Sequence, residues 1–205
     1  MIVILNLFFS ERRTIISMLM LFIAITVSAH SLAASQAKPD QEMRDLIKQT
    51  ISEAGSFEDR FDAEVWFVTM SGRLSRFIEN PKERLRLLRL VHREANRVGV
   101  QPELVLAIIE VESAFDPYAL SHVGAQGLMQ VMPFWRNEIG KPNDNLMKIE
   151  TNLRYGNTIL SAYLKREKGN LTRALARYNG SLGKTWYPER VFKAWQKNWF
   201  YQHQN

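Results

Sequence analysis

Apolar residues recur every three or four positions through most of the chain beyond residue 40. This is the spacing of helices that bury one face, and no segment has the pattern of a convincing strand. We therefore predict an all-α fold. The predicted helices span residues 42–53, 61–78, 81–98, 150–167, 171–178 and 188–200, with one more that begins at residue 102.

Helix boundaries are marked most clearly in the middle of the chain. Asn80 followed by Pro81 is typical of an N-cap and a first helical turn, and Gly99 is a natural stop for the same helix. Pro102 then opens the next helix. Residues 115–133 lose the helical spacing and contain several glycines and prolines, which predicts a loop.

The helix that starts at residue 102 has almost no polar face, so we expect it at the centre of the core. Its carboxylates Glu110 and Glu112 are two residues apart and therefore about 200° apart around the axis. Glu110 lies one heptad from Glu103, and the two are predicted to share a narrow solvent-exposed stripe. Glu112 lies over the apolar side chains of the preceding turns, on the side that packs: Val105, Ile108 and Ile109.

Burial of a lone carboxyl group raises its pKa and favours the protonated form near neutral pH. That is the state that a general acid requires, so Glu112 is a candidate catalytic residue. The spacing alone also fits a buried glutamate that caps the following loop, since perturbed carboxylates occur in structural networks as well. Both interpretations stay open at this point.

The N-terminus has the order of a secretory signal peptide: Arg12 and Arg13, then the apolar run 14–27, then small residues up to Ser35. We predict a signal peptide over residues 1–33, with an uncleaved membrane anchor as the alternative. The chain has no cysteine, which excludes disulfides and thiol catalysis. Its four histidines show no ligand spacing, so no metal site is expected.

The net charge is +6, with 27 Lys and Arg against 21 Asp and Glu, which favours an anionic partner such as nucleic acid, a membrane surface or an acidic polymer. Arg86, Arg89, Arg93 and Arg97 fall on one side of a predicted helix. A solvated helix face is the preferred interpretation, because no nucleic-acid motif accompanies these arginines. We therefore expect no nucleic-acid partner.

Residues 112–133 read E-S-A-F-D-P-Y-A-L-S-H-V-G-A-Q-G-L-M-Q-V-M-P. This run resembles the signature of the soluble lytic transglycosylase (SLT) domain, family 1, a lysozyme-like helical fold related to goose-type lysozyme. Residues 150–156 and 176–181 resemble later segments of the same domain. The resemblance covers about residues 82–195, which predicts a lysozyme-like transglycosylase domain over 81–205 and leaves 34–80 as a short helical extension. Phe134, Trp135, Gly180 and Ser181 depart from the family pattern.

The resemblance implies a peptidoglycan lytic transglycosylase that cleaves the MurNAc-GlcNAc β-1,4 bond and forms 1,6-anhydro-MurNAc, without metal or cofactor. Glu112 would serve as general acid and then base, and the loop's only other carboxylate, Asp116, reads as a turn residue. The residues implied to contact substrate are Ser121, Gly127, Gln130, Met132, Tyr178 and Asn179. Six further aromatic residues are candidates for stacking on sugar rings, of which at least half are expected to be packing: Trp135, Trp186, Tyr187, Trp195, Trp199 and Tyr201.

The implied partner is the peptidoglycan glycan strand, and the implied location is the periplasm, with membrane association if the N-terminal segment stays uncleaved. Two other functions remain compatible with the sequence. One is a hydrolytic muramidase on the same fold, in which water replaces the sugar's C6 hydroxyl. The other is a murein-binding module without catalytic activity.

Overall fold

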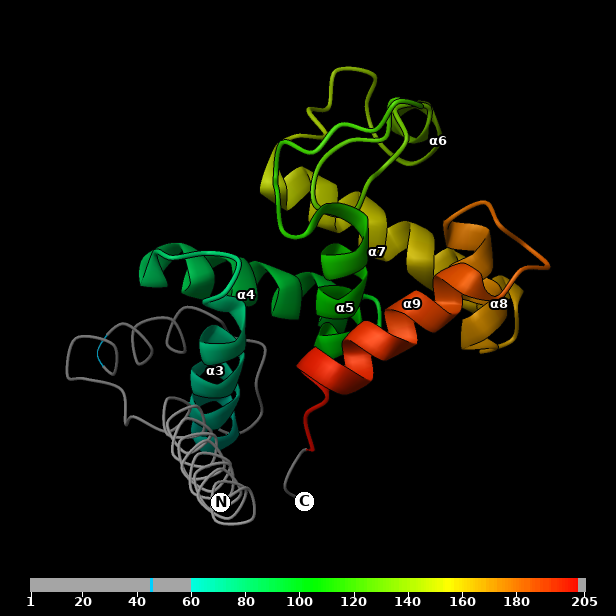
Figure 1. The fold of residues 1–205 in the computed structure, drawn as a ribbon. Coiled ribbons are helices and arrows are strands. Elements are labelled where there is room, and N and C mark those ends of the chain that lie inside the picture. Colours follow the sequence, from blue (N-terminus) through cyan, green and yellow to red (C-terminus); the bar gives the residue numbers. More distant parts are fainter. Residues whose placement is uncertain (1–44, 46–59, 203–205) are drawn as a thin grey trace, which may run out of the picture. The chain divides into compact units, whose positions relative to one another are not determined.

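A computed structural model describes residue 45 and residues 60–202, all of which belong to one compact unit, Pro39–Asn205. The predicted signal peptide 1–33 and the predicted helix 42–53, apart from residue 45, lie outside the described residues. The elements, shown in Figure 1, are α3 (Arg60–Leu74), α4 (Pro81–Arg97), α5 (Pro102–Ser113), α6 (Trp135–Ile139), α7 (Ile149–Arg166), α8 (Leu171–Tyr178), α9 (Trp186–Ala194) and the π-helix η2 (Trp195–Trp199).

Strand pairing in the described part of the chain is limited to isolated bridges of Gln126 with Leu120 and with Val131. The all-α prediction is therefore confirmed there. Sequence periodicity missed the short helix α6, and it read α9 and η2 as one helix over 188–200. None of the helices within residues 60–202 combines the length and hydropathy needed to cross a bilayer.

Helix α5 occupies the centre of the described helices, as its sequence predicts (Figure 1). Every residue from Pro102 to Ile109 is buried, and α4, α9 and η2 pack around the helix. Complete burial of each large aliphatic side chain contributes about 1.5–3 kcal/mol relative to exposure. The apolar composition of α5 thus requires that other elements surround it.

The two boundaries predicted around α4 are confirmed by their hydrogen bonds and dihedral angles. Asn80 Oδ1 accepts from the backbone N–H groups of Lys82, at 2.9 Å, and Glu83. These bonds satisfy donors that a helix start otherwise leaves unpaired. At the other end Gly99 has φ +70°, a left-handed conformation that lets the chain turn from α4 into α5.

The predicted solvent-exposed stripe of Glu103 and Glu110 is wrong. Glu103 is buried and accepts a hydrogen bond of 2.6 Å from Trp66 Nε1 on α3. Glu110 accepts from Asn198 Nδ2 at 2.8 Å and from Trp199 Nε1 at 2.6 Å. Because α3 and η2 are distant in sequence, the periodicity of α5 alone does not show that they cover this face.

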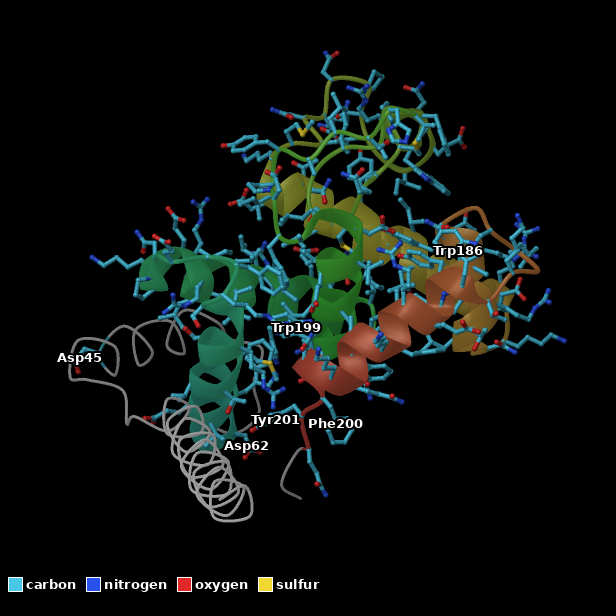
Figure 2. The ribbon with its side chains drawn as sticks, in the orientation of Figure 1. Asp45, Asp62, Trp186, Trp199, Phe200 and Tyr201 are labelled. Carbon is cyan, nitrogen blue, oxygen red and sulfur yellow. The ribbon has the colours of Figure 1, made fainter. Side chains whose placement is uncertain are left out.

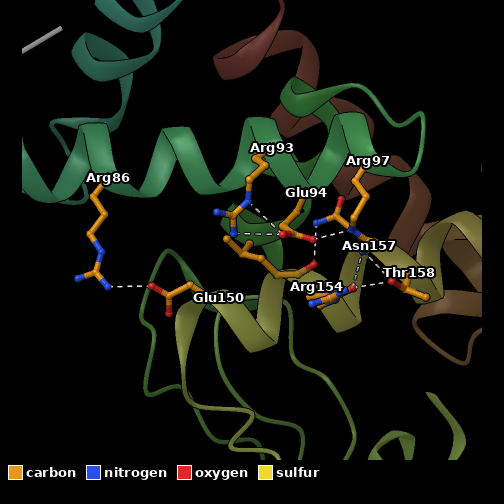
Figure 3. A network of polar contacts seen from close by, with 9 residues as sticks. Arg86, Arg93, Glu94, Arg97, Glu150, Arg154, Asn157 and Thr158 are labelled. Carbon is orange, nitrogen blue, oxygen red and sulfur yellow. Dashed lines mark hydrogen bonds and ion pairs between the residues drawn. The ribbon is translucent and has the colours of Figure 1, made fainter. Parts of the chain in front are cut away.

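Arg86 and Arg97, two of the four arginines in the row on α4, form a polar seam with α7, shown in Figure 3. Arg93 and Arg97 both bond the buried carboxylate of Glu94, and Arg97 also reaches a hydroxyl and a carbonyl oxygen on α7. Arg86 pairs with Glu150 on α7 at 2.8 Å. The exposed Arg86–Glu150 pair contributes up to about 1 kcal/mol, so it aligns the two helices more than it stabilises them.

Helix α3 supplies side chains to the same buried cluster as α4 and α5. Trp66, Phe67, Met70 and Leu74 are all 0–1% exposed. The predicted helix over 61–78 is observed as α3, and it ends earlier because the chain bends after Leu74. This part of the predicted extension therefore contributes to the core on which α5 rests.

The loop between α5 and α6 is fastened by one buried side chain, Asn152 on α7. Its Oδ1 accepts from Met129 N at 2.8 Å, and its Nδ2 donates to the carbonyl oxygens of Gln126 and Leu146 at 2.7 and 2.8 Å. Gly127 passes so close to this amide that a Cβ atom there would lie 2.6 Å from Asn152 Nδ2. The loop therefore has one tightly defined path over α7.

Replacing Gly127 by Ala is expected to destabilise the fold much more than replacing Gly124 by Ala. Both glycines have positive φ, +71° and +87°, which costs an alanine about 1–2 kcal/mol. Only Gly127 lacks space for a methyl group, since Gly124 has no atom within 4 Å of the added carbon, and overpacking costs about 1–3 kcal/mol more. Chemical denaturation of the two variants measures the difference, and equal losses would contradict the tight path of this loop.

Candidate active site

Glu112 lies in the last turn of α5, where the helix ends abruptly. Ala114 and Phe115 take left-handed conformations with φ +49° and +68°, which turn the chain away from the helix axis. Ser113 fastens the exit, because its Oγ donates to the carbonyl oxygens of Leu128, at 2.8 Å, and Ile109, at 3.2 Å. Glu112 is thus held at the junction between the buried helix and the loop that follows it.

The carboxyl group of Glu112 has a buried phenol as its hydrogen-bond partner. The Tyr187 hydroxyl on α9 donates to Glu112 Oε1 at 2.6 Å, and the Tyr187 side chain is 1% exposed. Burial raises the pKa of Glu112 to about 7, although the hydrogen bond from Tyr187 and the positive charge of Arg190 act in the opposite direction. Near neutral pH the group is therefore divided between its acid and base forms.

A second tyrosine lies close enough to interact electrostatically with Glu112. Burial, and then the negative charge of Glu112, raise the pKa of both Tyr178 and Tyr187 well above the usual value. Both phenols consequently stay neutral at physiological pH. Tyr178 Oη donates to the carbonyl oxygen of Met129 at 2.7 Å, so its direct partner is the loop and not the carboxyl group.

Three predicted substrate contacts, Ser121, Gly127 and Gln130, lie within the loop and bond its backbone. Ser121 Oγ accepts from Ala125 N at 3.0 Å. Gln130 Nε2 donates to the carbonyl oxygens of Gly127 at 2.9 Å and Ala119 at 3.1 Å, and Gln130 itself has φ +46°. The structure gives these residues a clear role in shaping the loop that follows Glu112.

The other predicted contacts lie at the edges of this arrangement. Met132 is half-buried just before α6, and its carbonyl oxygen accepts from Trp135 N at 3.1 Å. Asn179 forms the C-cap of α8 directly after Tyr178. Contact of any of these side chains with substrate remains a prediction.

Sequence reasoning missed the role of Tyr187, which it grouped with candidate ring-stacking residues. Tyr187 and Trp199 are instead buried, whereas Trp186, labelled in Figure 2, is 45% exposed. The ring centroids of Trp186 and Tyr187 are 5.9 Å apart. Tyr187 is 75 residues from Glu112. No local pattern signals that α9 would bring its hydroxyl to α5.

A groove of about 770 Å³ lies against α4, and Glu112 is not among the residues that line it. The loop residues 114–118 form one wall, and Leu87 and Leu90 of α4 contribute to the other. The volume lies within the range of small-ligand sites. Asp116 lies in this wall, and its carboxylate accepts from Tyr118 N at 2.8 Å, as a turn residue does.

Within residues 60–202, with residue 45, no group of three or more histidine, aspartate or glutamate side chains is arranged to hold a metal ion. The geometry of the described residues at this site supports proton transfer by Glu112, with Tyr187 orienting its carboxyl group.

A protonatable glutamate at the end of a buried helix can serve as a general acid, the role that one carboxyl group has in glycosidases. Residues 89–199, more than half of the chain, match the family model of the Transglycosylase SLT domain. The chain belongs to this family, which confirms the resemblance drawn from residues 112–133.

Curated relatives named membrane-bound lytic murein transglycosylase C cover parts of the chain. The relative from Actinobacillus pleuropneumoniae is 59% identical over 46 residues, which are 22% of this chain and 13% of the relative. That from Yersinia pestis is 35% identical over 112 residues, covering 47% of this chain and 31% of the relative. The chain thus spans less than a third of the length of these relatives.

Two solved structures are also similar, each at 24% sequence identity. The lytic transglycosylase Slt of Pseudomonas aeruginosa, an inactive mutant, gives a TM-score of 0.43 over 79% of this chain and 32% of that chain. A 70-kDa soluble lytic transglycosylase in complex with bulgecin A gives 0.44 over 78% and 27%.

Replacing Glu112 by Gln is expected to make stability less dependent on pH. The carboxyl group titrates near 4.5 in an unfolded chain and near 7 in the folded protein, so the folded form holds the proton between these values. Wild-type stability therefore falls as the pH rises through this window. The variant avoids that loss. Its free energy of unfolding should exceed that of the wild type by on the order of 3 kcal/mol at pH 8, but by little at pH 4.

Chemical denaturation at both pH values measures this gain. Glu189→Gln, on the exposed face of α9, is the control, because it removes a solvated carboxyl group from a helix that contacts the same site. A gain for Glu112→Gln that is equal at pH 4 and pH 8 would contradict the burial of this carboxyl group.

Proposed function

We propose that this chain is an exported murein lytic transglycosylase that cleaves the MurNAc-GlcNAc β-1,4 bond, with Glu112 as its single acid–base catalyst. The observation that carries the proposal is the Glu112 carboxyl group, held by Tyr187 at the end of the central helix with a pKa of about 7. Membership of the SLT family and the names of the curated relatives support the choice of substrate.

In the first step Glu112, in its protonated form, gives its proton to the glycosidic oxygen as the bond to C1 of the muramoyl residue breaks. Because Tyr187 donates to Oε1, the transferable proton resides on Oε2. The muramoyl acetamido group supplies anchimeric assistance at C1. The electrons of the broken bond stay with the leaving sugar, whose oxygen becomes a hydroxyl group.

In the second step Glu112 is a carboxylate and removes the proton from the muramoyl C6 hydroxyl group. The C6 oxygen attacks C1, displaces the acetamido oxygen and closes the 1,6-anhydro ring. The carboxyl group returns to its acid form and the cycle ends without water as a reactant. A pKa near 7 suits both steps, because acid and base forms are then close in free energy.

The structure favours a one-carboxylate mechanism over the usual glycosidase pair. Asp116 is engaged as a turn residue by Tyr118 N. Glu110 accepts hydrogen bonds from Asn198 and Trp199 on η2 and faces away from Glu112. Neither carboxylate is therefore available as a nucleophile or second base on the Glu112 side of α5.

The glycan is proposed to lie along the loop after Glu112, in contact with Ser121, Gly127, Gln130, Met132, Tyr178 and Asn179. The chain is further proposed to act in the periplasm, after removal of residues 1–33 or anchored by them, as the word membrane-bound in the relatives' names suggests. Residues 34–80 are proposed to be an extension to a catalytic domain over 81–205.

A hydrolytic muramidase and a non-catalytic murein-binding module remain the competing functions. The module is the less favoured of the two, because a binding surface has no need of a desolvated carboxyl group that titrates near pH 7. The muramidase reaction differs from that of the lytic transglycosylase only in the second step, so the two are distinguished by their products.

Digestion of purified murein followed by mass analysis of the muropeptides tests the reaction. We expect 1,6-anhydro ends, and reducing ends would instead establish hydrolysis. Glu112→Gln is expected to lower the rate by about 100-fold or more, since positioned general acids contribute at least that factor. Glu110→Gln, the same substitution on the opposite face of α5, is the control and should retain most activity. Wild-type rates for Glu112→Gln would exclude the catalytic role.

Replacing Tyr187 by Phe is expected to move the alkaline limb of the kcat/KM profile to higher pH. The hydrogen bond from Tyr187 lowers the pKa of Glu112, so its removal lets burial raise that pKa further. The rate at the optimum should fall because the carboxyl group loses its orientation. Tyr178→Phe, which removes a bond to Met129 instead, is the control. A limb that stays in place or moves to lower pH in Tyr187→Phe would contradict this role.

A further inference from the structure

A second hollow, of about 500 Å³, lies between the end of α3 and the π-helix η2. It is on the side of α5 that carries Glu110, opposite Glu112. Arg73 and Arg76 line it from the α3 side, and Lys197 and two amide side chains line it from η2. Phe200, which directly follows η2 in Figure 2, is 59% exposed and completes the wall.

The charge of this hollow is strongly one-sided. The described residues that line it include three cations, Arg73, Arg76 and Lys197. No aspartate or glutamate is among these described lining residues. Two carboxylates outside the lining interact with these cations: Glu110 pairs with Arg76 at 3.3 Å and is shared with Asn198 and Trp199, and Glu103 acts electrostatically on Arg73. A concave surface with one sign of charge concentrates ions of the opposite sign.

The two guanidinium groups are already fixed in position. Arg76 donates to Asn198 Oδ1 at 3.1 Å, and its Cζ lies 4.7 Å from the centroid of the Phe77 ring. Arg73 donates to the carbonyl oxygen of Phe200 at 2.7 Å. Each guanidinium group has five N–H donors. Among the contacts of the described residues, Arg73 uses one of them and Arg76 uses two. The remaining donors can bind a ligand.

Burial also lowers the pKa of Arg73, against the opposing charges of Glu103 and Tyr201. Its guanidinium group is therefore partly stripped of water, and an anion in the hollow would restore the lost interactions. The π-helical turn that presents Lys197 is a rare conformation that is frequently found at functional sites. Arg73 and Arg76 precede residues 89–199, so the hollow is built jointly by the family domain and the segment before it.

We propose that this pocket binds the phosphate group of a phosphorylated ligand. Three cations match the charge of a phosphate monoester, about −1.5 to −2 at pH 7, better than that of a single carboxylate. Guanidinium groups bind phosphate oxygens in a two-pronged geometry. The volume exceeds that of an isolated ion, and the amides of Gln196 and Asn198 and the ring of Phe200 offer contacts to the remainder of the ligand. A soluble phosphate ester and a lipid headgroup share this chemistry.

Gly72 offers a direct way to close the pocket. It lines the hollow on α3, and an added Cβ there meets no atom within 4 Å. Gly72→Glu would therefore place a carboxylate in the pocket without a backbone clash, whereas Gly72→Ala leaves it open. Arg76 is left unchanged, because it also holds Glu110 and Asn198.

Isothermal titration calorimetry of the full chain with glycerol 3-phosphate and with inorganic phosphate tests the proposal. We expect binding by the wild type and by Gly72→Ala, and none by Gly72→Glu. Arg73→Gln and Lys197→Gln should each weaken binding by about ten-fold, the effect of one lost charge-assisted hydrogen bond. Unchanged thermal unfolding of Gly72→Glu verifies that the variant is folded.

Sedimentation with phosphatidylcholine vesicles, with and without phosphatidic acid, distinguishes the two sources of phosphate. Retention that requires phosphatidic acid and is lost in Gly72→Glu identifies a lipid headgroup. Binding of glycerol 3-phosphate without such retention identifies a soluble ester, and either result supports the pocket. Absence of binding in both assays, or binding that persists in Gly72→Glu and Arg73→Gln, overturns it.

Discussion

The burial of α5 on all sides is the constraint on which the rest of the structure depends. A helix with no polar residue between Leu104 and Ile109 is stable in water only if other elements surround it, and α4, α9 and η2 do so. The Glu112 carboxyl group, in the last turn of this helix, shares its low-polarity environment. The raised pKa of Glu112 is thus a consequence of how the core is built, and no metal is needed to produce it.

The two glutamates at the end of α5 show how the same helix holds carboxyl groups of different chemistry. Glu110 pairs with the Arg76 guanidinium and accepts hydrogen bonds from an amide and an indole N–H. Glu112 meets one neutral phenol as its direct partner, which orients the group while leaving its proton free to exchange. Burial raises the pKa of Glu112, and a single neutral donor opposes that effect only in part.

Features encoded within a few residues were predictable from the sequence, and contacts between distant elements were not. The Asn80 cap, the start of α5 at Pro102 and the span of α8 follow from local pattern. The bond from Trp66 to Glu103 joins residues 37 positions apart, and that from Tyr187 to Glu112 joins residues 75 apart. Both depend on how α3 and α9 cross α5, and helical periodicity specifies which face is buried but not which element covers it.

The residues of the motif at 112–133 mainly contact one another and the neighbouring helix α7. This explains why the motif identifies the fold more firmly than the substrate. Gly127 leaves no space for a side chain beside Asn152, and Gln130 holds two loop carbonyl oxygens from a left-handed conformation. A sequence that keeps these residue types keeps the path of the loop, and with it the position of Glu112. Phe134, which departs from the family pattern, lies just beyond this framework and is 54% exposed. Substitution there leaves the framework intact, so differences in glycan preference within this fold are expected to arise at such rim positions and not within the motif.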